Sequence, residues 1–153
     1  MANVSCGIMP YKIDNGKIKV FLCHPGGPYF KNMNKNWCIA KGHVEEGENY
    51  RVAAEREFEE ETGQTVKIKD DLFHMVMSKS KKYVGCFFVN VNSIDPDKCY
   101  SNTFKIKTKT GAEIEAPEIN AWKWFDIKDA YKYIEKYQEP LLLFLEDTIK
   151  YMY

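Results

Sequence analysis

Apolar residues gather along the chain in short runs typical of β-strands, with one helical pattern in the middle and two near the end. The runs 4–13 and 17–23 are joined by Asp14-Asn15-Gly16, a strong turn signal, so the chain is predicted to open with a hairpin. Residues 24–36 contain Pro25-Gly26-Gly27-Pro28 and are predicted to form a loop, and residues 37–40 a short strand.

A helix over residues 49–62 is the clearest element, because good helix formers dominate it and Gly63 follows where a left-handed cap belongs. Two helices are expected at the end, one capped by Asp126 and running to Tyr137, the other over 141–152 with Pro140 in its first turn. Further strands are predicted at 66–68, 72–77, 83–91, 104–108 and 122–125. This order indicates a mixed α/β sandwich instead of regular βαβ winding.

The composition fits a single domain over residues 1–153, since 44% hydrophobic residues can bury a sizeable core. Lys+Arg and Asp+Glu both number 22, so net charge gives no bias toward nucleic acid or membrane, and a small-molecule partner is expected. The five cysteines lack a CxxC pair and are expected to be reduced thiols. No stretch reaches the length of a membrane span, and the expected location is cytoplasmic.

Charge is unevenly distributed: between Lys41 and Gln64, eight acidic residues stand against three basic ones. Glu57, Glu60 and Glu61 are spaced i, i+3 and i+4, so their carboxylates share one face of the predicted helix and repel one another. The helix dipole adds to this repulsion at the C-terminal end. Most Glu-rich helices are merely solvated, but a hard cation with oxygen ligands, Mg²⁺ or Mn²⁺, would convert this repulsion into binding.

The wider pattern adds to this prediction. Gly42, Glu48, Arg56-Glu57-Phe58, Glu60-Glu61 and Gly63 stand at spacings that resemble the Nudix box of Nudix hydrolases. Gln64 departs from the pattern, which usually has an aliphatic residue there.

The similarity extends beyond the box. Segments around it resemble predicted Nudix NTP pyrophosphohydrolases, and Lys41-Gly42-His43-Val44-Glu45 also resembles diadenosine tetraphosphate hydrolases. The resemblance implies a Nudix-type α/β/α sandwich with a mixed β-sheet, in which the box forms a loop, a helix and a loop.

The resemblance also implies roles for individual residues. Glu57, Glu60 and Glu61 would bind metal together with the carbonyl of Lys41, and Glu57 or Glu60 would accept a proton. Arg56 would orient a box glutamate, either Glu48 or Glu57. A further carboxylate outside the box is expected as ligand or base, and the candidates are Glu115 and Glu118.

The expected activity is Mg²⁺-dependent hydrolysis of a phosphoanhydride bond, most simply in a nucleoside triphosphate, by a monomer or homodimer. Hydrolysis of a dinucleoside polyphosphate such as diadenosine tetraphosphate is an alternative, and a Nudix module that binds a nucleotide without cutting it is a second. Two lysine groups are candidates for phosphate contact, Lys79, Lys81 and Lys82 or Lys105, Lys107 and Lys109, although surface lysines without a ligand are the commoner case. The candidates for further substrate contact, including stacking on a base, are Trp37, Lys41, Tyr83 and Trp122.

Overall fold

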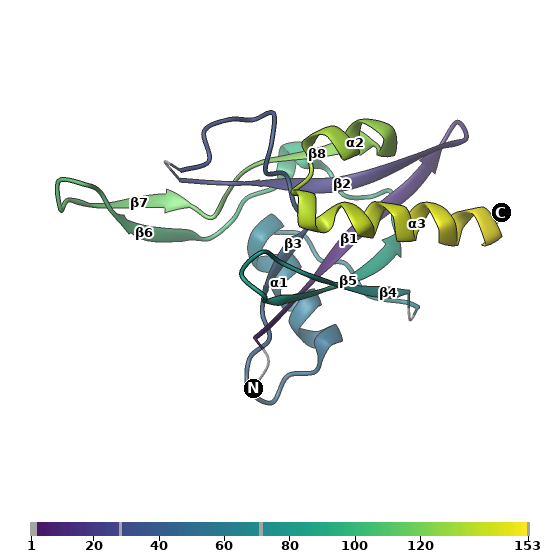
Figure 1. Ribbon diagram of the computed structural model, residues 1–153, viewed down its shortest axis with the longest axis horizontal. Helices are drawn as coiled ribbons and strands as arrows, with labels where there is room; N and C mark the ends of the chain where they lie inside the picture. Colours follow the sequence, from purple (N-terminus) through teal and green to yellow (C-terminus); the bar gives the residue numbers. More distant parts are fainter. Residues whose placement is uncertain (1–2, 28, 71, 153) are drawn as a thin grey trace.

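A mixed β-sheet between helices organises the computed structural model, which describes residues 3–27, 29–70 and 72–152 (Figure 1). The elements follow in the order β1 (Val4–Asp14), β2 (Lys17–Pro25), β3 (Ala40–His43), α1 (Tyr50–Thr62), β4 (Phe73–Met77), β5 (Tyr83–Asn90), η1 (Pro96–Lys98), β6 (Thr103–Lys107), β7 (Glu113–Pro117), β8 (Ile119–Asp126), α2 (Ile127–Tyr133), η2 (Lys136–Gln138) and α3 (Glu139–Met152).

The long strand β1 connects the two halves of the main sheet, whose strand order is β4-β5-β1-β2-β8. It runs parallel to β5 along residues 4–11 and antiparallel to β2 at residues 11–14. On that same edge its first half, residues 5–8, pairs with β3 instead. The sheet is therefore mixed, and β3 enters it where β2 has left β1.

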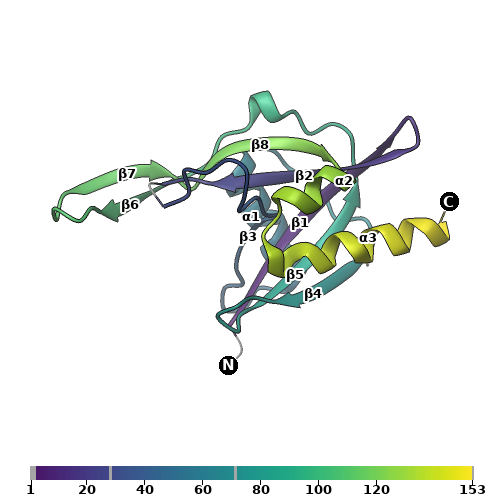
Figure 2. The same ribbon diagram turned by 45° about the horizontal axis from the view of Figure 1, so that its top comes forward.

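Alternating residues of the sheet fill two separate cores. Met9 and Phe88 face α2 and α3, where Leu141, Leu142, Leu145 and Ile149 are buried. Ile8 and Phe87 face the opposite side, against Ala53, Ala54 and Phe58 of α1. Figure 2 shows α2 and α3 in front of the sheet, with α1 behind it. The predicted α/β/α sandwich is confirmed.

Strands β6 and β7 form a separate two-stranded hairpin that projects from the main body (Figure 1). Phe104 pairs with Ala116 and Ile106 with Ile114, so these four side chains share one face. The sequence prediction included β6 and missed β7, because the charged and apolar residues of β7 alternate over only five positions.

Two predicted strands are wrong. Residues 37–40 are not one strand: Cys38 exchanges two backbone hydrogen bonds of 2.8 Å with Cys23, and regular pairing with β1 begins only at Ala40. Residues 66–68 lie outside any strand, although Val66 and Ile68 are buried. The backbone of Ile68 is instead paired with side chains of α1, since its N–H donates to Glu55 and its carbonyl accepts from Arg51.

The helix predicted from Asp126 to Tyr137 is too long. Helix α2 ends at Tyr133, and Ile134 adopts an extended conformation and bridges to Trp37 before the short turn η2 begins. Asp126 occupies the N-cap position, but its side chain makes no capping hydrogen bond.

Both ends of α1 are capped, the C-terminal one at Gly63 as the sequence predicts. Asn49 accepts a 2.8 Å hydrogen bond from the Val52 N–H, and the Gly63 N–H donates to the Glu59 carbonyl with φ at +74°. Added at Gly63, a Cβ atom would lie 2.4 Å from the ring of Tyr100, so the residue needs both its left-handed backbone and its missing side chain.

Gly63→Ala should therefore lower the free energy of unfolding by more than the roughly 1 kcal/mol expected for a left-handed alanine alone. The matched control is Gly16→Ala, because Gly16 has φ at +76° and a Cβ atom added there would meet no other atom within 4 Å. Urea unfolding of both variants measures the difference. Equal losses would show that the contact with Tyr100 is unimportant.

Candidate functional site

The last turn of α1 is held in place by hydrogen bonds to its free carbonyl groups. Those of residues 59–62 would lack partners in an isolated helix, but here each accepts a hydrogen bond. The donors are the N–H groups of Gly63 (2.8 Å), Asn102 (3.3 Å) and Tyr100 (3.0 Å) and the indole Nε1 of Trp122 (2.9 Å). The turn is thus fixed to the segment before β6 and to β8.

Strand β3 lies directly against this turn. The Lys41 N–H donates to Glu61 Oε1 at 3.2 Å. At the next position, a Cβ atom on Gly42 would stand 2.0 Å from Glu57 Cδ. Only glycine allows the carboxylate of Glu57 to lie so close to the β3 backbone.

Arg56 hydrogen-bonds three glutamates of this region, Glu48, Glu57 and Glu60. Its Nε and Nη2 donate to both carboxylate oxygens of Glu48, at 2.7 and 3.0 Å, and these hydrogen bonds lower the pKa of Glu48. Its Nη1 donates to Glu57 at 2.9 Å and to Glu60 at 3.2 Å. Arg56 was expected to orient either Glu48 or Glu57, and its side chain contacts both.

The carboxylates are crowded, and Glu61 among them is buried. Burial raises the pKa of Glu61 to about 8, and repulsion by Glu57 and Glu118 adds to the effect. Burial also raises the pKa of Glu57 and of Glu118, each with a further contribution from Glu60. Four carboxyl groups therefore face a common region where negative charge is costly.

This donor set fits a hard divalent cation, because it consists of carboxylate oxygens beside the backbone of Lys41 and Gly42. Within residues 3–27, 29–70 and 72–152, no three His, Cys, Asp or Glu side chains stand as ligands of one ion. Nη1 of Arg56 hydrogen-bonds Glu57 and Glu60 together instead. A cation would have to replace that contact.

The two candidates for the outer carboxylate lie in different places. Glu118 interacts electrostatically with Glu57, Glu60 and Glu61 and so belongs to the cluster. Glu115 lies on the exposed hairpin, where it accepts a hydrogen bond from Thr103. The structure thus brings Glu118 to the helix and leaves Glu115 apart.

The three aromatic candidates for substrate contact lie in different parts of the fold. Trp37 is 4% exposed and packs edge-on against Phe125 in the core. Trp122 donates its indole N–H to the end of α1. Tyr83 lies between Lys82 and Val84, which line a hollow that Tyr83 does not line.

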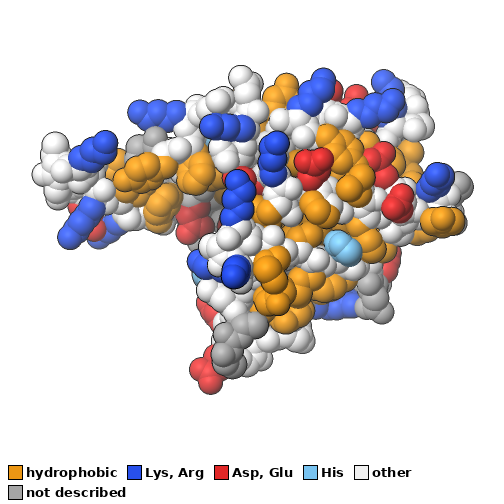
Figure 3. All heavy atoms as spheres, in the orientation of Figure 1, with side chains coloured by type: hydrophobic (Ala, Val, Ile, Leu, Met, Phe, Trp, Pro, Cys, Tyr) orange, Lys and Arg blue, Asp and Glu red, His pale blue; other side chains and the backbone are white. Residues whose placement is uncertain are grey.

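Two adjoining hollows form a groove beside the cluster. Lys41, Glu135 and Tyr137 line both. The first, about 270 Å³, also includes Glu61, Glu118 and Phe30. The second, about 410 Å³, also includes Lys79 and Lys82, while Lys105 and Lys107 lie on the hairpin. Figure 3 shows acidic and basic side chains meeting where the hairpin joins the body of the molecule.

Sequence reasoning missed Asn36, Glu135 and Tyr137. Glu135 and Tyr137 were missed because residues 126–137 were predicted to form one continuous helix, and Asn36 because residues 24–36 were predicted only as a loop. The sequence did not indicate a partner for His24. This side chain is fully buried, and its Nε2 donates to the carbonyls of Asn32 and Lys35 at 3.1 Å. His24 thereby holds the loop that carries Phe30 and Asn36 along the groove.

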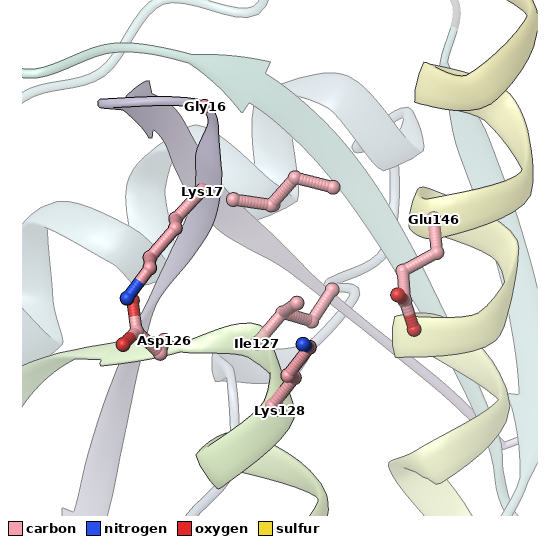
Figure 4. Close-up of a pocket in the computed structure, with 7 residues that line it drawn as sticks. Gly16, Lys17, Asp126, Ile127, Lys128 and Glu146 are labelled. Atoms are coloured by element: carbon pink, nitrogen blue, oxygen red, sulfur yellow. The ribbon is translucent and has the colours of Figure 1, made fainter.

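Another hollow, of about 280 Å³, opens between the β1–β2 turn and the last two helices (Figure 4). Lys17 and Lys128 line it together with Asp126 and Glu146, and Figure 4 shows Lys17 pointing toward Asp126. None of the clustered glutamates borders it, and its two positive and two negative charges balance.

Comparison with known proteins identifies the family of the chain. A family model described as the NUDIX domain matches residues 7–145. The chain belongs to the NUDIX family. It is accordingly a Nudix hydrolase, and the loop, helix and loop from Gly42 to Gln64 form its Nudix box.

Relatives of this Nudix hydrolase include an RNA pyrophosphohydrolase of Pelagibacter ubique (strain HTCC1062), 29% identical over 134 residues that cover 80% of this chain and 75% of that protein. Among solved structures, a C. elegans Ap4A hydrolase binary complex superposes with a TM-score of 0.72 and 25% identity, covering 95% of this chain and 98% of that one. The NUDIX domain of Shewanella oneidensis NrtR, complexed with ADP ribose, has a TM-score of 0.68, covers 97% of this chain and 89% of its own, and at 11% identity shows the shared fold alone.

No helix within the described part of this Nudix hydrolase combines the length and the apolar character needed to cross a membrane.

Stability of the metal-free Nudix hydrolase should fall as the pH rises from about 4.5 toward about 8. The unfolded chain releases the Glu61 proton near 4.5, whereas the folded protein holds it until about 8, so the folded state binds more protons in between. Glu61→Gln should reduce this decline, by an amount on the order of a few kcal/mol at most.

The measurement is chemical unfolding in EDTA across this pH range. Exposed Glu59 provides the control, since Glu59→Gln should leave the slope unchanged. A wild-type protein whose stability stays level from pH 5 to 8 would contradict the burial argument.

Proposed function

We propose that this Nudix hydrolase uses Mg²⁺ to cleave a phosphoanhydride bond in a nucleoside polyphosphate, with nucleoside triphosphates as the first candidate substrates. The observation that carries the proposal is the crowding of Glu57, Glu60, Glu61 and Glu118 beside a groove that also contains lysines. Repulsive carboxylates favour a divalent cation, and nearby lysines favour the anionic chain that such a cation would polarise.

The four carboxylates and the Lys41 carbonyl are the groups that would hold the metal. When bound, a divalent ion lowers the pKa of a coordinated water molecule and neutralises charge on phosphate oxygens. Lys79 and Lys82 contact the phosphates farther along the groove. Glu57 or Glu60 accepts the proton of the attacking water at a carboxylate oxygen.

Arg56 is built to remain in place when its neighbours turn toward a metal. Two of its nitrogens are held by Glu48, and Nη2 also donates to the His43 carbonyl at 3.0 Å. Nη1 alone serves Glu57 and Glu60. Those carboxylates can leave Nη1 without freeing the guanidinium, which keeps the loop before α1 tied to the helix.

Glu60→Gln should lower kcat by roughly 100-fold or more, because it removes a metal ligand or proton acceptor. It should also weaken the rise in melting temperature that Mg²⁺ produces. Glu59→Gln is the matched control: it makes the same change one residue away, on an exposed side chain. Equal activity and equal Mg²⁺ response in the two variants would place the metal elsewhere.

Dinucleoside polyphosphates are the second candidate class. The groove continues on both sides of Lys41, which leaves room on each side of a phosphate chain, and the C. elegans Ap4A hydrolase has a similar fold over nearly its whole length. The name of the P. ubique relative adds triphosphorylated RNA to the substrates that require testing.

A Mg²⁺-dependent screen should separate these classes. The panel contains the four NTPs, Ap4A, a short 5′-triphosphorylated RNA and ADP-ribose, with ¹⁸O-labelled water to locate the attacked phosphorus. We expect turnover of an NTP with release of pyrophosphate. Turnover of Ap4A or RNA alone would reassign the substrate, and no Mg²⁺-dependent turnover of any compound would reject the proposal.

A further inference from the structure

Glu135 and Tyr137 line both hollows of the groove. They belong to the segment between α2 and α3, which forms one wall of the groove. Neither residue belongs to the carboxylate cluster. Glu135 lines the hollow that also includes Glu61 and Glu118, but it belongs to the segment between α2 and α3 and accepts a hydrogen bond from Asn36. A further carboxylate, outside the glutamate cluster and beside the lysines of the groove, requires an explanation.

The position of Glu135 is set from two directions. Its backbone N–H donates to the Trp37 carbonyl at 2.8 Å. Its Oε1 accepts a hydrogen bond from the side-chain amide of Asn36, whose φ of +70° places it in the left-handed region that asparagine tolerates. The half-buried carboxylate is therefore held in one orientation. Its other oxygen, Oε2, takes no part in the hydrogen bond with Asn36.

Tyr137 is positioned by a buried neighbour. Gln138 is fully buried, where its Oε1 accepts from the Ile39 N–H at 3.0 Å and its Nε2 donates to the Tyr137 hydroxyl oxygen at 2.9 Å. Because the oxygen already receives a proton there, the hydroxyl is left to donate its own. The wall thus presents one acceptor group and one donor group to the groove.

A carboxylate repels phosphate, so Glu135 must face an uncharged part of an anionic substrate. The sugar is the uncharged part closest to the phosphates, and Glu135 shares both hollows with Lys41. A ribose carries two neighbouring hydroxyl groups, and a carboxylate accepts two such hydrogen bonds side by side.

On the basis of the proposed function, we infer that Glu135 is a specificity-determining residue. It accepts hydrogen bonds from the 2′ and 3′ hydroxyls of the substrate ribose, and Asn36 holds it in position. The enzyme then distinguishes ribonucleotides from nucleotides that lack these hydroxyls. Tyr137 supports the same sugar from the adjoining position.

The test compares kcat/KM for ATP, 2′-deoxy-ATP and 2′,3′-dideoxy-ATP. The wild-type enzyme should prefer ATP over the dideoxy form by about 10-fold or more, mainly through KM. Glu135→Ala should bring the three values within about 3-fold of each other, because kcat/KM falls most for ATP, less for 2′-deoxy-ATP and not for 2′,3′-dideoxy-ATP. Glu135→Gln, which keeps one acceptor, should give an intermediate ratio. A ratio measured within one variant is unaffected by partial loss of folded protein.

Glu139→Gln is the matched control, since Glu139 begins α3 four residues later and lines neither hollow. It should keep the wild-type preference. Inosine triphosphate serves as a base control, because it differs from ATP in the base and keeps the ribose.

A wild-type enzyme without ribose preference, or a preference that survives Glu135→Ala, would overturn the inference. So would a Glu135→Ala effect confined to the comparison of ATP with inosine triphosphate, which would assign the residue to the base. If the wild-type enzyme hydrolyses none of these nucleotides, the assignment of nucleoside triphosphates as substrates fails by itself. The ribose contact is then decided by calorimetric binding of ATP and dideoxy-ATP, where equal affinities of the wild-type protein would reject it.

Discussion

The contact between the end of α1 and the backbone of β3 is the constraint on which the site depends. Glycine at position 42 lets the carboxylate of Glu57 approach the strand, and the Lys41 N–H fixes Glu61. Both carboxyl groups lose water in this arrangement, so their ionised forms become costly. The free-energy cost of ionised carboxylates at this helix end would be offset by positive charge, from Arg56 and from a bound cation.

Keeping that helix end rigid requires the rest of the chain. The carbonyls of its last turn are satisfied by residues from the segment before β6 and from β8, which are distant in sequence. Trp122, a candidate for stacking on a base, donates its indole N–H to this turn. The segment after the helix is fixed in a similar way, because Arg51 and Glu55 hydrogen-bond the backbone of Ile68.

The sequence could predict what depends on local pattern. The hairpin β1–β2, the capped helix α1 and the glutamate row all follow from turn residues, caps and spacing, and the structure contains them. The strand at residues 66–68 was wrong because burial alone does not show whether a backbone pairs with a strand or with side chains. The groove wall at Glu135 could not be found, since its place depends on the break in α2 and on the pairing of Trp37 with Ile134.

The projecting hairpin β6–β7 has a consequence for how an anion reaches the protein. On the face opposite Phe104 and Ile106, Lys105 lies across from Glu115 and Lys107 across from Glu113. These opposite charges cancel at short range, and Lys109 in the turn leaves the arm with a net charge of only +1 over residues 103–117. The arm that extends farthest into solvent therefore exerts little long-range pull on a polyphosphate. Under the proposed function, diffusional encounter would be guided by Lys79 and Lys82, which line the groove, and would bring the chain there rather than onto the most exposed appendage.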